Sequence, residues 1–197
     1  MPIKHILINL TRELIRTFAV VDEWFDKEHS LHCYKPASGG WCVHEVLEHI
    51  MLTNHYLLVI IEKGCEKALR KHELLADKNY ISEGYTLANP ALLAIGKNKS
   101  FEWQRPEHHR PTGEKPLEEI RRAIRNQLAR CLDTIDQLPG GEGVLHQTTM
   151  SVNNLGKLDV YQYIYFLSLH VQRHLQQLCA IEEEFKGSSV AFGIEGR

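Results

Sequence analysis

The chain has 197 residues, a formal net charge of −2 and a hydrophobic fraction of 43%, which is typical of one globular domain with a substantial core. A charge so close to neutral argues against a general nucleic-acid binder, because neutralising phosphates requires a clustered surplus of Lys and Arg. The most apolar run, Tyr56 to Ile61, is too short to span a bilayer. Five cysteines without a C-x-x-C pair favour reduced thiols, so we expect a cytoplasmic protein that binds neither nucleic acid nor membranes.

Apolar residues recur at three- and four-residue steps in four stretches, which is the main signal of amphipathic helices. In chain order they run from Ile3 to Phe25, from Val43 to Ile61, from Pro116 to Ile135 and from Val160 to Ile181. Proline suits the first turn of the third helix, and Asp159, directly before the fourth stretch, suits a helix N-cap. Four helices of this length predict an all-α protein with a four-helix bundle.

The connection between the second and third helices is long, from about Lys71 to Lys115. Within it we expect a short helix near Pro90 to Ile95, with the rest draped over one end of the bundle. A short extended piece is expected around Thr148 to Val152. The bundle is predicted to be a single domain over residues 1–186, followed by a tail, 187–197, whose last four residues match a protease recognition sequence of expression vectors.

The helical stretch SLHVQRHLQQL, residues 168–178, places His170 and His174 one turn apart on one face. Such a pair is either part of a metal site or two polar residues at the core margin, hydrogen-bonded to their neighbours, and the fourth helix alone leaves both readings open. A metal would need a third ligand from another element. His49 is the candidate, because it lies on the shoulder of the second helix's apolar stripe and can point into a space between helices.

Other histidines in and near the second helix do not suit the same site. His44 and His55 diverge from His49 by about 140° and about 120° around the helix, so neither can share a metal with it. We expect Glu45 to be solvated on the helix shoulder. The pair His108-His109, in a proline-rich part of the long connection, is likewise expected to be solvated.

Two motifs together resemble a known family. The stretch GGWCVHEVLEHI, residues 39–50, has a tryptophan eight residues before a helical histidine, and SLHVQRHLQQL follows about 120 residues later. In this order they resemble the second-helix and fourth-helix motifs of the DinB-like superfamily. The resemblance implies a four-helix bundle with a long second connection, often dimeric, whose three histidines bind a divalent metal. Carried over by position, these ligands are His49, His170 and His174.

The resemblance also implies two kinds of activity. Characterised members are thiol-dependent transferases or isomerases that use glutathione, bacillithiol or mycothiol, and other members are described as metal-dependent hydrolases. We therefore expect a divalent-metal enzyme acting on a small-molecule substrate, with zinc, nickel or iron as the metal and a low-molecular-weight thiol as a possible cosubstrate. The alternative is a non-catalytic metal-binding or stress-related dimeric bundle.

No second catalytic residue is evident in the sequence. Tyr161, Tyr163 and Tyr165 precede His170 on the fourth helix and are expected to serve packing. Arg173, between the two histidines, is expected to be an exposed helix arginine.

Assembly is predicted from the first helix and the resemblance together. The first helix has apolar residues off its main stripe, at Ile6, Ile15, Val20 and Trp24. These exceed what one packed face requires, and we expect a homodimer.

Overall fold

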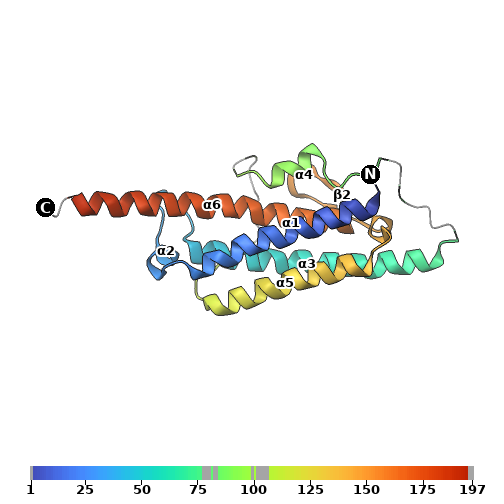
Figure 1. The fold of residues 1–197 in the computed structure, drawn as a ribbon, viewed down its shortest axis with the longest axis horizontal. Coiled ribbons are helices and arrows are strands. Elements are labelled where there is room, and N and C mark those ends of the chain that lie inside the picture. The colour runs from blue at the N-terminus through green and yellow to red at the C-terminus, as the bar shows by residue number, and fades with distance from the viewer. Residues whose placement is uncertain (1, 77–80, 82–83, 99, 101–106, 195–197) are drawn as a thin grey trace.

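The computed structural model describes residues 2–76, 81, 84–98, 100 and 107–194. Its four long helices form the bundle shown in Figure 1: α1 (Ile3–Glu23), α3 (Val43–Leu74), α5 (Leu117–Gln137) and α6 (Val160–Ile194). Two short helices, α2 (His29–Cys33) and α4 (Pro90–Ile95), lie in the connections. The described residues also form one two-stranded antiparallel sheet of β1 (Gln147–Met150) and β2 (Gly156–Asp159). The prediction of an all-α four-helix bundle is confirmed.

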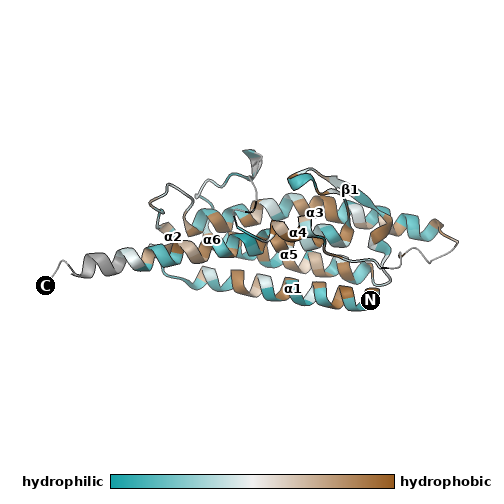
Figure 2. Ribbon diagram, turned by 90° about the horizontal axis from the view of Figure 1, so that it is seen from above, coloured by the Kyte–Doolittle hydropathy of each residue, from teal (hydrophilic) through white to brown (hydrophobic). Residues whose placement is uncertain are grey.

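The core is built from the apolar stripes that the sequence predicted. Buried residues recur at helical spacing on every long helix, for example Leu10 and Leu14 on α1, Leu47 and Ile50 on α3, and Ile120 on α5. Figure 2 shows apolar and polar residues sharing each bundle helix, as amphipathic packing requires. Helices α3 and α6 run in opposite directions (Figure 1), and the start of α3 lies beside the middle of α6.

Two helix starts are fixed by side chains. Asp159 is the N-cap of α6: its Oδ1 accepts a hydrogen bond from the Gln162 N–H at 2.9 Å, and the Asp159 N–H donates to Gln162 Oε1 at 3.1 Å. At the start of α3, Glu45 accepts from the Cys42 N–H at 2.8 Å and also binds Lys35. The expected cap at Asp159 is confirmed, whereas Glu45 is not a free solvated residue but holds the helix start.

Two helices are longer than predicted. Helix α3 continues from Ile61 to Leu74, and α6 continues from Ile181 to Ile194. The expected boundary between domain and tail therefore falls inside α6, whose C-terminal part extends beyond the other helices in Figure 1. The last three residues, 195–197, lie outside the described residues.

The long connection was predicted correctly at its helix and wrongly in its path. Helix α4 has the predicted bounds, and its N-cap Asn89 accepts a hydrogen bond from the Leu92 N–H. The connection was expected over one end of the bundle, but its described residues bind at both ends. Tyr85 binds Asp159 at the start of α6, and Gly113 binds Glu48 at the start of α3. Among the described residues, no helix is both long enough and apolar enough to cross a membrane.

The expected extended piece is confirmed as β1, and the structure adds its partner β2. Asn153 (φ 48°) and Asn154 (φ 52°) between the strands, and Gly156 (φ 71°) at the start of β2, adopt left-handed backbone conformations. Asn and Gly are the residue types that reach this region at least cost, so the turn follows from its sequence. The hairpin leads directly into the N-cap of α6.

Candidate metal centre

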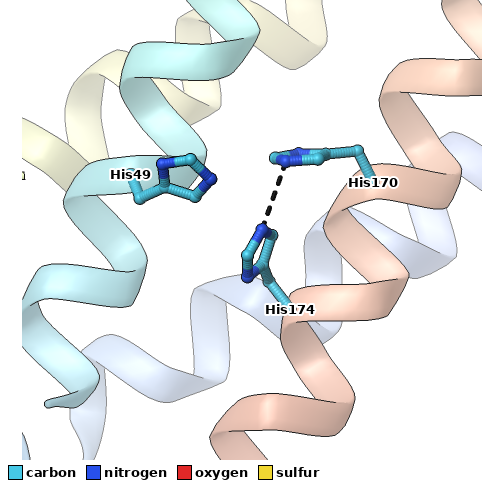
Figure 3. A group of neighbouring side chains, drawn as sticks. All are labelled: His49, His170 and His174. Carbon is cyan, nitrogen blue, oxygen red and sulfur yellow. Dashed lines mark hydrogen bonds between the residues drawn. The ribbon is translucent and has the colours of Figure 1, made fainter. Parts of the chain in front are cut away.

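Three histidines from two antiparallel helices converge inside the bundle. His49 projects from the second turn of α3 toward His170 and His174, which lie one turn apart on α6 (Figure 3). All three are buried, with exposed fractions of 4%, 2% and 5%. One ring nitrogen from each lies within 4.8 Å of the others, and the two Nε2 atoms of His170 and His174 are 3.1 Å apart.

This spacing suits a shared ion. Nitrogens that bind one tetrahedral ion at about 2.1 Å lie about 3.4 Å from one another. The His170–His174 separation is already close to that value, and a ring nitrogen of His49 lies within 4.8 Å of both. The cluster is therefore of a kind that could hold a metal ion, and its donor set of three imidazoles fits zinc, nickel or iron.

Outer hydrogen bonds orient two of the rings. His49 Nδ1 lies 2.7 Å from the carbonyl oxygen of His109. A carbonyl only accepts, so Nδ1 carries the proton and Nε2 is the nitrogen left for the cluster. On α6, His174 Nδ1 lies 3.0 Å from Gln177 Oε1, which fixes the same tautomer. Metal-binding histidines characteristically have such partners on their second nitrogen.

Electrostatics keep one of the three rings, His170, uncharged. Burial, and then the neighbouring His174 and His49, lower the pKa of His170 well below its ordinary value. His170 is therefore a neutral imidazole at physiological pH, and the neutral ring is the form that binds a metal. The ligand group found among the described residues consists of histidines alone, without a carboxylate.

A segment of the long connection, residues 107–113, lies across the start of α3 beside the cluster, and we call it the strap. It includes the 3-10 turn η2 (Glu107–His109). The strap supplies the carbonyl that binds His49, and the His109 ring lies 5.0 Å from the ring of Tyr56. His109 is half-buried, so the expectation that it is solvated was wrong. The side chain of His108 lies outside the described set.

Glu48, next to His49 on α3, binds the strap directly. The residue is 3% exposed. It accepts hydrogen bonds from the Thr112 N–H at 3.0 Å, the Gly113 N–H at 2.7 Å and the Thr112 hydroxyl at 3.2 Å. The sequence interpretation missed both Glu48 and the His109 carbonyl. A carbonyl contact across 60 residues does not depend on the side chain at position 109 and leaves no sequence signal.

The other histidines of α3 are not part of the cluster. His44 Nε2 lies 2.7 Å from the Lys115 carbonyl oxygen, and His55 is exposed with its ring against Tyr56. Trp41, just before α3, places its ring 4.7 Å from the ring of His49. It therefore forms part of the wall around that imidazole.

Two tyrosines and one arginine of α6 donate to backbone carbonyls. The hydroxyl of Tyr161 donates to the Leu138 carbonyl, and that of Tyr163 donates to the Thr149 carbonyl at 3.1 Å. Arg173 donates to the Lys97 carbonyl at 2.7 Å. These contacts agree with the structural roles expected for the tyrosines, and they give Arg173 a contact that its sequence position did not predict.

Comparison with known proteins identifies the family. The model of the DinB superfamily matches residues 10–178, which include the three histidines, α3, α5 and most of the bundle portions of α1 and α6. No curated protein and no solved structure matches the chain. The match covers most of the sequence, so the chain belongs to the DinB superfamily, as its two motifs indicated.

Proposed function

We propose that this member of the DinB superfamily is a metalloenzyme that binds one divalent ion through His49, His170 and His174 and acts on a small molecule. The observation that carries the proposal is the convergence of three buried imidazoles, two of them oriented by outer hydrogen bonds. A purely structural role for buried histidines would be met by hydrogen bonds to neighbouring carbonyls and hydroxyls. Here one nitrogen of each ring is directed at the other two rings instead.

Three protein ligands suit a catalytic site, since a closed structural site uses four. A bound divalent ion would supply Lewis-acid chemistry, lowering the pKa of a water or a thiol at an open position. The chain's own part is to hold three imidazoles in place, with the bundle core around them.

Within this function, a low-molecular-weight-thiol transferase is favoured over a hydrolase. A hydrolase needs a general base beside its water. On α6, Tyr163 and Arg173 donate to backbone carbonyls, and Gln172 next to Arg173 donates to Glu13 and Thr17 on α1. A cosubstrate thiol brings its own nucleophile and removes that requirement. The five cysteines are all free thiols, which fits the reducing compartment where such cosubstrates are found.

We propose further that the chain forms a homodimer through α1. Of the four residues that the sequence offered for such a face, Ile6 and Trp24 are buried within the protomer. Ile15 and Val20 remain exposed, and Ile8, two turns before Ile15, is exposed with it. Light scattering at micromolar concentration should give twice the chain mass, and Ile15→Glu should give the monomer mass. A wild-type monomer contradicts the dimer without affecting the metal site.

The test of the function is elemental analysis followed by an activity screen. Protein purified without chelators should contain one zinc, nickel or iron per chain, and His49→Ala should contain none. The loaded protein is then tested for transfer of glutathione, bacillithiol and mycothiol to electrophiles, and for hydrolysis. Protein without stoichiometric metal contradicts the site. Loaded protein that is inactive in every assay favours the alternative, a metal-binding bundle without catalysis.

A further inference from the structure

The strap is attached to α3 at two adjacent residues. His49 donates to the His109 carbonyl, and Glu48 accepts three hydrogen bonds from Thr112 and Gly113. Both attachments join neighbouring positions on α3 to positions three or four residues apart on the strap. The contact with the imidazole and the contact with the carboxylate are therefore parts of one docking arrangement.

The Glu48 attachment is the stronger of the two. A buried carboxylate is costly unless its oxygens accept hydrogen bonds, and bonds to a charged acceptor are about twice as strong as neutral ones. Here both oxygens accept from the strap. Neutralising Glu48 would leave backbone N–H groups facing a weaker acceptor, so the strap depends on this side chain.

The chain between the two attachments is stiff, so the attachment of Thr112 and Gly113 to Glu48 limits where the His109 carbonyl can lie. Pro111, which is buried, fixes its own φ angle and restricts Arg110 before it. Gly113 has φ +73°, and a Cβ there would lie 3.3 Å from Glu45 Cγ. The turn at Gly113 thus brings two N–H groups onto Glu48 at a point that only glycine occupies without strain.

We propose that Glu48 is a positioning residue for the metal centre. It holds the strap so that the His109 carbonyl binds His49 Nδ1–H and directs His49 Nε2 at His170 and His174. The role in metal binding rests on the proposed function. The role in fixing the His49 tautomer does not, because it concerns the hydrogen bonds of the metal-free protein.

The main experiment compares Glu48→Gln with Glu62→Gln. Glu62 is also a glutamate of α3 that accepts hydrogen bonds from another segment, but its donor is Arg130 on α5 and not the strap. The Zn²⁺ dissociation constant is measured by chelator competition. Loss of an outer partner weakens metal binding by roughly 10–100-fold, and we expect Glu48→Gln to weaken it about 10-fold. Glu62→Gln should match the wild type.

Two measurements on metal-free protein separate this proposal from the proposed function. Amide hydrogen exchange should speed up at Thr112 and Gly113 in Glu48→Gln, and ¹⁵N NMR should show His49 changing from the Nδ1–H tautomer to a mixture. If Glu48→Gln folds poorly, Thr112→Val is used in its place. This variant removes one of the three donors and keeps the side-chain shape, so it should cause smaller changes in the same direction.

The outcomes are distinct. A wild-type protein that binds no Zn²⁺ defeats the proposed function, while the tautomer and exchange data still decide whether Glu48 positions His49. If Glu48→Gln keeps both wild-type affinity and the wild-type tautomer, the positioning role is overturned. Faster strap exchange with an unchanged His49 tautomer also overturns it, because Glu48 would then anchor the strap without acting on the imidazole.

Discussion

The connection between α3 and α5 meets two buried polar clusters, one at each end of the bundle, and they differ in how their atoms are satisfied. At the start of α6, Tyr85 donates a hydrogen bond to Asp159 Oδ2 at 2.9 Å, while the Gln162 N–H binds the other oxygen. At the start of α3, the strap binds Glu48 and His49. Both clusters are nearly closed to solvent, and both tie the same connection to a helix.

The difference lies in where the polar atoms point. Both oxygens of Asp159 are bound by the chain itself, so the cluster is complete without a ligand. At the histidine cluster, the chain binds the outer nitrogens of His49 and His174 and leaves the inner nitrogens directed at one another. Burial alone therefore does not identify a binding site. A candidate site is identified by the geometry of the polar atoms that the chain leaves facing one another.

The largest expected effect is on metal content, which should depend on the histidine cluster and not on the Asp159 cluster. His49→Ala and His170→Ala each remove one proposed ligand and should weaken Zn²⁺ binding by more than about 100-fold, beyond the loss of an outer partner. The fold should survive, because apolar stripes on four helices hold it. Elemental analysis and circular dichroism check both statements.

The controls for this prediction lie outside the cluster. His55→Ala changes an exposed histidine of the same helix, and Asp159→Asn changes the other buried polar cluster. Both should keep stoichiometric metal. Metal retained in His49→Ala and His170→Ala, or lost as readily in His55→Ala, contradicts the ligand assignment.

The sequence predicted the bundle because its stripes are strongly apolar, and it failed where that signal weakens. Beyond Ile61, the buried face of α3 is formed by small residues such as Cys65 and Ala68, which add little to an apolar periodicity. Strand β2 is GKLD, with Leu158 as its one apolar residue. Its pairing with β1 depends on backbone hydrogen bonds and a turn, so periodicity could not identify it.

The three histidines could be proposed from helix geometry and family motifs, because both depend on local spacing. The supporting contacts could not. Glu48 reaches Thr112 and Gly113 across 64 and 65 residues, and the groups it binds include backbone N–H groups that every non-proline residue has. Which glutamate of α3 is buried under the strap depends on the path of the connection, and that path was predicted wrongly.

The second prediction tests whether the Asp159 cluster is complete but electrostatically costly. Burial raises the pKa of Asp159 from 3.8 to about 6. The folded protein therefore holds this proton more tightly than the unfolded chain, and stability falls as pH rises from about 4 to about 6. The difference corresponds to about 2–3 kcal/mol. Asp159→Asn, which keeps a good N-cap, should flatten this part of the profile.

Urea unfolding of the wild type and of Asp159→Asn at several pH values measures the free energy of unfolding of each protein as a function of pH. The wild type should lose stability relative to the variant as the pH rises through this window, with no further divergence above it. Parallel stability profiles would show that Asp159 is solvated well enough to ionise normally, and the contrast between the clusters would then lose its electrostatic part.

The third prediction concerns the strap turn. Gly113→Ala forces a left-handed conformation on alanine, which costs about 1–2 kcal/mol, and places a Cβ 3.3 Å from Glu45 Cγ. We expect lower stability and a several-fold weaker Zn²⁺ affinity. Gly156→Ala is the matched control, because it has φ +71° with open space around the new Cβ and lies in the hairpin. It should lower stability similarly and leave metal affinity unchanged.

The smallest expected effect tests whether the two ends of the connection are independent. Tyr85→Phe removes one donor from Asp159, which should cost about 1 kcal/mol. The hydrogen bond from Tyr85 lowers the pKa of Asp159, against the larger effect of burial. Its loss should therefore move the pH-dependent part of the stability profile to higher pH. Zn²⁺ affinity and hydrogen exchange of the strap should not change, because Glu48 and His49 hold residues 109–113 directly. A measurable loss of affinity in Tyr85→Phe would show that tension along the connection reaches the histidines, and the two clusters would have to be treated as one coupled unit.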